Sequence, residues 1–201
     1  EGPIRLALRG FLGVDFFFVL SGFLITTLLL REESRTGRFS LSGFYMRRAL
    51  RILPVYFLVL TGICGYYVLI KGQSEYIPLV PYYYLFLSNF LIDDIPLLTV
   101  TWSLSVEEQY YLIWPLLLLF LPVAGKMRVI VLFSLIGLCV ATEMGIFGAL
   151  GMVPVRTEYA VWYLQGTGYS AILIGSLLAV GLHHQRGFSA FVRVFGHRLA
   201  P

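Results

Sequence analysis

The chain has 201 residues, of which 58% are hydrophobic and 13% are charged, with a formal net charge of +4 and a mean hydropathy of +0.82. Because a soluble domain carries about twice that share of charged residues, the composition excludes an ordinary soluble globule. The positive charge does not indicate nucleic-acid binding, since the Arg residues lie in short segments between apolar runs. We therefore predict a single all-α domain over residues 1–201, built as a multi-span transmembrane helical bundle.

Apolar runs recur along the chain, and most approach the roughly 20 residues that a helix needs to cross a bilayer. They predict five transmembrane helices, at about residues 14–30, 53–70, 103–122, 129–151 and 160–182. The aromatic segment 82–92 is too short to span, and its Tyr residues favour headgroup depth, so we expect an interfacial or re-entrant piece. Cys64 and Cys139 lie inside apolar runs without metal-ligand spacing, which predicts packing residues and no metal site.

The segment 31–51 contains Arg at six positions and Glu at only two. Short loops that are rich in Arg remain in the cytoplasm. The charge pattern therefore predicts that this segment is cytoplasmic and that 71–101 is external. The expected location is the cell (inner) membrane.

Three Arg residues precede Pro54 in the segment 44–54, at positions 47, 48 and 51. On a helix, Arg47, Arg48 and Arg51 lie within one arc of about 100°. A guanidinium presents a planar fork of donors that matches phosphate oxygens, which favours a phosphate-binding site. The alternative is a topological role, in which the same side chains snorkel to lipid phosphates.

Two adjacent acids lie near the start of the run 103–122. Ser105 and Glu108 match the capping-box pattern, so Glu108 is expected to close the helix N-terminus. Glu107 lies beside Trp102, Tyr110 and Tyr111, where a carboxylate is a candidate for proton transfer. The alternative for Glu107 is a first-turn acid that complements the helix dipole.

Three further polar residues lie within or beside the apolar runs. Asp15 opens the run 14–30, where a carboxylate suits a helix N-terminus and a structural role. Ser21 precedes Gly22, and such a pair in a membrane helix permits close packing. Glu143 lies inside the run 129–151, so we expect it to face a polar cavity, with no assigned role.

Three of these segments together resemble the acyltransferase-3 family of integral-membrane acyltransferases. They are residues 13–25 (GVDFFFVLSGFLI), 44–54 (FYMRRALRILP) and 102–111 (WSLSVEEQYY). The resemblance implies transfer of an acyl group, commonly acetyl from acetyl-CoA, to a hydroxyl of a cell-surface sugar, a lipid-linked glycan or a secondary metabolite. The implied partners are an acyl-CoA donor, a carbohydrate or lipid-linked acceptor and the lipid bilayer, without a bound cofactor or nucleic acid.

The resemblance also implies roles for residues. Arg47, Arg48 and Arg51 match the family's Arg motif and imply donor binding, while Glu107 matches its conserved acid and implies catalysis. Supporting or structural roles are implied or expected for Asp15, Ser21, Trp102, Ser103, Glu108, Tyr111 and Glu143. The family's essential His belongs to a helix before the first motif, and we expect the chain to begin after that helix.

His183, His184 and His197 match no motif of the family. A different class of function is also considered, a transporter or flippase-like protein. In that reading, Arg47, Arg48, Arg51 and Glu143 line a permeation path. The chain shows no internal repeat of the kind that many transporters carry.

Overall fold

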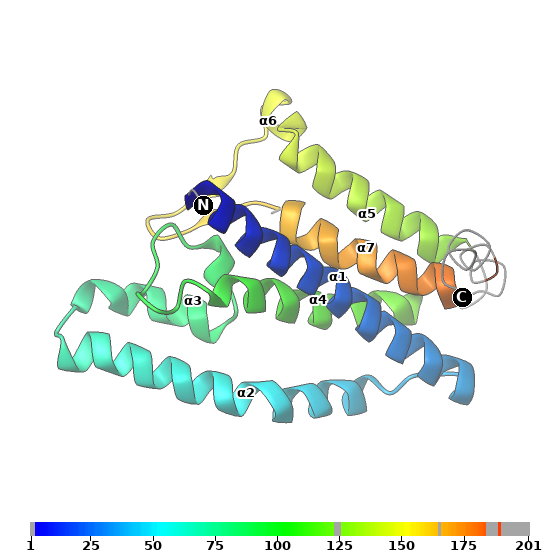
Figure 1. Cartoon of the computed structure of the whole chain (residues 1–201), viewed down its shortest axis with the longest axis horizontal. Coiled ribbons are helices and arrows are strands. Elements are labelled where there is room, and N and C mark those ends of the chain that lie inside the picture. The colour runs from blue at the N-terminus through cyan, green and yellow to red at the C-terminus, as the bar shows by residue number, and fades with distance from the viewer. Residues whose placement is uncertain (1–2, 123–125, 165, 184–188, 190–201) are drawn as a thin grey trace. The chain divides into compact units, whose positions relative to one another are not determined.

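The computed structural model describes residues 3–122, 126–164, 166–183 and 189, and most of them are helical (Figure 1). The α-helices are α1 (Pro3–Thr36), α2 (Leu41–Gly65), α3 (Val80–Tyr84), α4 (Thr101–Phe120), α5 (Met127–Glu143), α6 (Ile146–Ala149) and α7 (Gly166–His183). A π-helical turn, Tyr66–Ile70, continues α2, and 3-10 turns lie at Ser74–Leu79 and Ser88–Phe90. The described strands, β1 (Val155–Arg156) and β2 (Val161–Trp162), form one short antiparallel hairpin. The helical class is therefore confirmed.

The chain divides into two compact units. Unit 1 consists of Glu1–Phe39, Trp114–Ile146 and Gln165–Pro201, and unit 2 consists of Ser40–Ile113 and Phe147–Leu164. Helix α4 contributes its first residues to unit 2 and its last residues to unit 1. We describe each unit separately.

Unit 1 is organised around the contact between α1 and α7, which lie side by side (Figure 1). A Cβ atom on Gly22 would overlap the backbone carbonyl of Ile172, and one on Gly175 would overlap the backbone of Val19. The Ser176 hydroxyl donates a hydrogen bond to the Gly22 carbonyl oxygen at 3.1 Å. The close approach of α7 to Gly22 agrees with the packing role expected for the Ser21–Gly22 pair.

Three helix boundaries in unit 1 differ from the prediction. Helix α1 begins at Pro3, so Asp15 lies well inside it and not at its N-terminus. Helix α5 ends at Glu143 because Gly145 adopts a left-handed conformation, with φ of 72°, and the run 129–151 is therefore not one helix. Helix α7 begins at Gly166, since residues 161–162 belong to β2.

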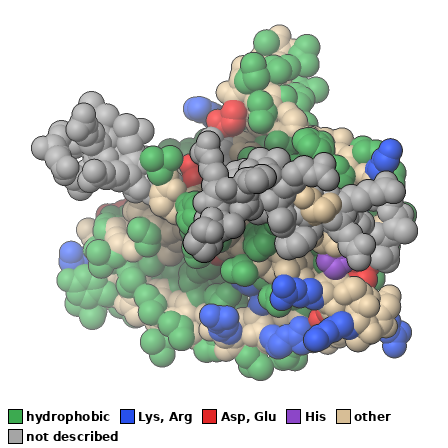
Figure 2. All heavy atoms as spheres, turned by 45° about the vertical axis from the view of Figure 1, so that its right-hand side comes forward, with side chains coloured by type: hydrophobic (Ala, Val, Ile, Leu, Met, Phe, Trp, Pro, Cys, Tyr) green, Lys and Arg blue, Asp and Glu red, His purple; other side chains and the backbone are tan. Residues whose placement is uncertain are grey.

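Among the residues that the structure describes, two helical stretches are long and apolar enough to cross a membrane, Leu12–Thr36 and Leu41–Ile70, while Gly168–His183 is apolar but shorter. Exposed apolar side chains recur every four residues along α1, at Leu12, Phe16, Leu20, Leu24 and Leu28. Figure 2 shows hydrophobic side chains at many places on the surface of the described residues. A row of large exposed apolar side chains along one helix is typical of contact with lipid or another protein. These features support a membrane protein, and the five-span bundle stays a prediction.

Unit 2 has a core of buried apolar and aromatic side chains, which are Tyr56, Leu60, Cys64, Tyr67, Leu79, Tyr83, Ile95 and Leu98. The buried Tyr83 hydroxyl donates to Asp94 Oδ1 at 3.0 Å and accepts from the Ile95 amide, so it ties α3 to the following loop. The segment 82–92 folds as the end of α3, a loop and a 3-10 turn. Cys64 and Cys139 are both buried, which agrees with packing roles.

Candidate active site in unit 2

The Arg motif lies near the start of α2, whose first turn is capped by Ser40 through a hydrogen bond from the Gly43 amide. Arg48 approaches α4, with Nη2 at 3.4 Å from Glu108 Oε1 and Cζ at 3.4 Å from the centroid of the Tyr111 ring. Arg47 and Arg51 are exposed on the same helix. The structure therefore separates the three residues into one half-buried Arg beside α4 and two exposed ones.

Helix α4 begins at Thr101, a full turn before the predicted cap. The Thr101 amide bonds to the Leu98 carbonyl, and its hydroxyl donates to the same oxygen at 2.7 Å. Ser105 is buried inside the helix, with its hydroxyl 2.8 Å from that of Ser88. The capping-box prediction for Ser105 and Glu108 is wrong, because contacts with the preceding loop start the helix earlier and Glu108 pairs with Arg48 instead.

Glu107 is buried in the second turn of α4, with 4% of its surface exposed. No acid lies in the first turn of this helix, so the helix-dipole interpretation of Glu107 is also wrong. Its Oε1 accepts a hydrogen bond from the Tyr111 hydroxyl at 3.1 Å. The position of Glu107 is one where a carboxylate is shielded from solvent and held by a defined donor, which suits a role in proton transfer.

A cavity of about 320 Å³ lies beside these groups in unit 2. It is lined by Tyr45, Arg48, Ala49, Leu53, Leu85, Phe86, Glu108, Gln109, Tyr111 and Leu112. Arg48 Nε is buried and has no hydrogen-bond partner among the described residues. Since buried donors are usually paired, this N–H is an exception among the buried polar groups of unit 2. The cavity therefore combines an apolar wall with a fixed cationic group.

Gln109 and Phe86 are residues of the cavity that sequence reasoning missed. Gln109 Nε2 donates to the Phe86 carbonyl oxygen at 2.6 Å and to Asn89 Oδ1 at 2.8 Å. Phe86 has φ of 55°, a left-handed conformation that costs energy for a residue with a Cβ, and the Gln109 contact helps to hold it. The position of Gln109 beside Glu108 was a signal for its role, whereas no sequence pattern marked Phe86.

The remaining predicted residues lie apart from one another. Ser103 and Trp102 are in the first turn of α4, where the Ser103 hydroxyl donates to the Val100 carbonyl oxygen. Asp15 is exposed on α1 and Ser21 is half-buried there. Glu143 is exposed at the end of α5, and its Oε1 accepts from the Gly166 amide at 2.8 Å. Glu143 therefore caps α7 and does not face a polar cavity within a span.

His183 lies in the last turn of α7, whereas His184 and His197 fall outside the residues that the structure describes. Within the described part of the chain, no group of three or more His, Cys, Asp or Glu residues has the geometry to hold a metal ion.

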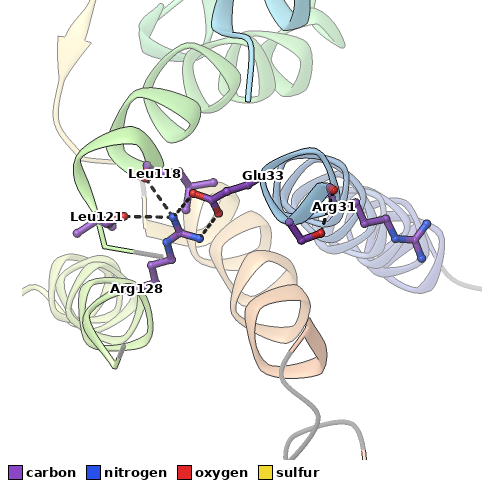
Figure 3. Close-up of polar contacts among 6 residues, drawn as sticks. Arg31, Glu33, Leu118, Leu121 and Arg128 are labelled. Atoms are coloured by element: carbon purple, nitrogen blue, oxygen red, sulfur yellow. Dashed lines mark hydrogen bonds and ion pairs between the residues drawn. The ribbon is translucent and has the colours of Figure 1, made fainter. Parts of the chain in front are cut away.

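Unit 1 contains a second polar cluster, which the sequence did not suggest. Arg128 forms a bidentate ion pair with Glu33, with Nη1–Oε2 at 2.7 Å and Nη2–Oε1 at 2.8 Å (Figure 3). Nη2 also donates to the carbonyl oxygens of Leu121 at 3.1 Å and Leu118 at 3.4 Å. Since both side chains are buried, the cluster ties α1, the end of α4 and α5 together.

The family of acyltransferase domains matches residues 2–195 of the chain. The peptidoglycan O-acetyltransferase OatA of Listeria monocytogenes is 32% identical over 165 residues, which cover 75% of the chain and 26% of that protein. YrhL of Bacillus subtilis, named as a candidate peptidoglycan O-acetyltransferase, is 32% identical over 187 residues, which cover 85% of the chain and 29% of that protein. The chain thus spans less than a third of the length of these relatives. No solved structure matches the chain significantly.

Proposed function

We propose a function for this chain from its family, since it belongs to the acyltransferase-3 family. The protein transfers an acetyl group from an acyl-CoA donor, such as acetyl-CoA, to a hydroxyl of a cell-envelope carbohydrate. Peptidoglycan is the first acceptor to test, because two similar proteins are named for it. Lipid-linked glycans and secondary metabolites are the next acceptors. Family membership favours this enzyme over a transporter or flippase-like protein.

The observation that carries the proposal is the arrangement around the unit 2 cavity. Arg48, Glu108 and Tyr111 line the cavity, and the buried carboxylate of Glu107 is held by the Tyr111 hydroxyl. The Arg48 guanidinium lines the cavity, and the shielded Glu107 carboxylate is bonded to Tyr111, which also lines it. Together they meet two requirements of acyl transfer from a thioester. The first is a group that positions the anionic donor, and the second is a group that takes part in proton transfer.

In the proposed reaction, the acceptor hydroxyl oxygen attacks the thioester carbonyl carbon as it loses its proton. The C–O bond forms, the C–S bond breaks, and CoA leaves as a thiol that carries the proton. Glu107 takes part in removing the proton from the acceptor. Arg47 and Arg51, exposed on α2, bind phosphates of the donor, while Arg48 is held in a fixed orientation by Glu108 and Tyr111.

The same proposal places the protein in the cell (inner) membrane, with the Arg-rich segment 31–51 in the cytoplasm and 71–101 outside. The support is the asymmetry of Arg between short segments. A cysteine introduced at position 38 of the Cys-free protein is expected to resist an impermeant thiol reagent in intact cells. Labelling of that cysteine without permeabilisation would reverse the assigned orientation.

Glu107→Gln is expected to lower acetyl-transfer turnover by roughly a hundredfold or more, because the amide keeps the shape of the side chain and removes the carboxylate from proton transfer. The matched control is Glu108→Gln on the adjacent residue, which keeps a hydrogen-bond acceptor for Arg48 and is expected to weaken donor binding with little effect on turnover. The measurement is the rate of acetyl transfer to peptidoglycan by the full-length protein at matched expression. Equal turnover of Glu107→Gln and wild type would remove Glu107 from the chemistry.

Arg47→Ala and Arg51→Ala are expected to weaken binding of acetyl-CoA and to reduce the dependence of its affinity on salt, since each variant removes a cation from the phosphate-binding face. Arg48→Lys keeps the charge but loses the planar fork, and it is expected to weaken binding as well. The control is Arg38→Ala, because Arg38 is also exposed but lies outside α2. This variant should bind acetyl-CoA as tightly as wild type does. Unchanged donor affinity in all three α2 variants would refute a donor site at this motif.

A further inference from the structure

Tyr111 contacts two charged groups of the candidate site through different parts of one side chain. Its hydroxyl donates to Glu107 Oε1 at 3.1 Å, and the face of its ring lies 3.4 Å from the Arg48 guanidinium carbon. Only 3% of Tyr111 is exposed. Burial strengthens both contacts, because little water competes with the hydrogen bond or with the cation–π interaction.

The backbone explains why this residue reaches both groups. Glu107 and Tyr111 are four residues apart on α4, so their side chains lie one above the other on the same face of the helix. Arg48 comes from α2, and its guanidinium is held between the Tyr111 ring and the Glu108 carboxylate. The phenol therefore connects a group of α4 with a group of α2 inside unit 2.

We propose that Tyr111 is a positioning residue with two separable functions: its hydroxyl orients Glu107 for proton transfer, and its ring orients Arg48 for the donor. The proposal rests on the function proposed above and adds a residue that acts through both charged groups. The two functions can be separated by substitution, since phenylalanine at position 111 keeps the ring beside Arg48 but has no hydroxyl to donate a hydrogen bond to Glu107. An aliphatic residue removes both contacts.

The test compares Tyr111→Phe and Tyr111→Leu in the full-length protein, with acetyl-CoA as donor and peptidoglycan as acceptor. Tyr111→Phe is expected to lower kcat about tenfold while the KM for acetyl-CoA stays within about twofold of wild type. Tyr111→Leu is expected to lower kcat similarly and also to raise the KM for acetyl-CoA about tenfold. In a Glu107→Gln background, Tyr111→Phe should cause no further loss of kcat.

The control is Tyr56→Phe, which removes the hydrogen bond from a buried phenol of unit 2 to the Tyr83 carbonyl oxygen at 2.8 Å and does not line the cavity. It reports the kinetic effect of losing a buried tyrosine hydroxyl as such, and kcat and KM should remain close to wild type. The proposal is overturned if Tyr111→Phe matches Tyr56→Phe in both constants. It is also overturned if Tyr111→Phe and Tyr111→Leu have the same KM, or if the effects of Tyr111→Phe and Glu107→Gln multiply.

A second measurement does not depend on activity. Thermal unfolding of the purified full-length protein is compared in two double-mutant cycles, one of Tyr111→Phe with Glu107→Leu, which removes the hydrogen-bond acceptor, and one of Tyr111→Leu with Arg48→Met. Non-additive shifts in Tm in both cycles support the two contacts, and additive shifts in either cycle overturn the proposal. If wild type transfers no acetyl group, the proposed function fails, and these cycles still decide whether Tyr111 holds both charged groups.

Discussion

Gly22→Ala is expected to destabilise unit 1 by about 3 kcal/mol or more, at the upper end of the cost of overpacking, because the new methyl group would overlap the backbone carbonyl of Ile172. A flexible side chain could move aside, but backbone atoms of α7 can yield only if the two helices separate. Separation also breaks the hydrogen bond from the Ser176 hydroxyl to the Gly22 carbonyl. Gly175→Ala meets the backbone of Val19 on α1 and is expected to behave in the same way.

Gly137→Ala is the matched control for this experiment. Gly137 lies inside α5 of the same unit, and a Cβ added there would contact nothing within 4 Å. Because alanine is a better helix former than glycine, this variant should be as stable as wild type or more stable by up to about 1 kcal/mol. The measurement is thermal unfolding of the purified full-length protein. If Gly22→Ala and Gly137→Ala unfold at the same temperature, α1 and α7 do not pack as closely as the structure has them.

Arg128→Met is expected to destabilise the protein by about 3–5 kcal/mol, because it leaves the buried carboxylate of Glu33 without its partner. The carbonyl oxygens of Leu118 and Leu121 also lose a donor at the end of α4. Combining Arg128→Met with Glu33→Leu removes both charges, and this double variant is expected to recover most of the lost stability. The measurement is again the thermal unfolding of the full-length protein.

Arg31→Met is the control, since Arg31 is exposed and its side chain extends away from the pair in Figure 3. Its free energy of unfolding should stay within about 0.5 kcal/mol of wild type. A double variant that is no more stable than Arg128→Met alone would show that the loss does not come from an uncompensated charge. If the double variant recovers the lost stability, the cost of Arg128→Met measures the unpaired Glu33 carboxylate and not the net contribution of the ion pair.

The sequence by itself determined the helical class, the family and most helix positions. These properties depend on composition and on motifs that are local in the chain. Alternation of apolar runs with short Arg-rich segments predicted helices close to α1, α2 and α4, with errors mainly at their ends. The close contact at Gly22 was also predictable, because a small residue within an apolar helix permits backbones to approach.

Local patterns failed where a distant segment competes for the same group. Ser105 and Glu108 fit a capping box in the sequence. In the structure, the Ser105 hydroxyl is hydrogen-bonded to Ser88, and the Glu108 carboxylate forms an ion pair with Arg48. Glu143 appeared to lie in the middle of an apolar span, yet α5 ends there and the carboxylate caps α7. In each case, the residue that forms the observed contact is distant in the sequence, so a local pattern could not predict it.

The tertiary structure alone decided which of the three Arg residues enters the candidate site and which groups surround it. Helical spacing places Arg47, Arg48 and Arg51 within one arc but does not say which part of that arc meets α4. Arg48 contacts Tyr111 and Glu108 of α4, whereas Arg47 and Arg51 are exposed. The pairing of Arg128 with Glu33 has the same origin, since 95 residues separate the two charges that burial forces together.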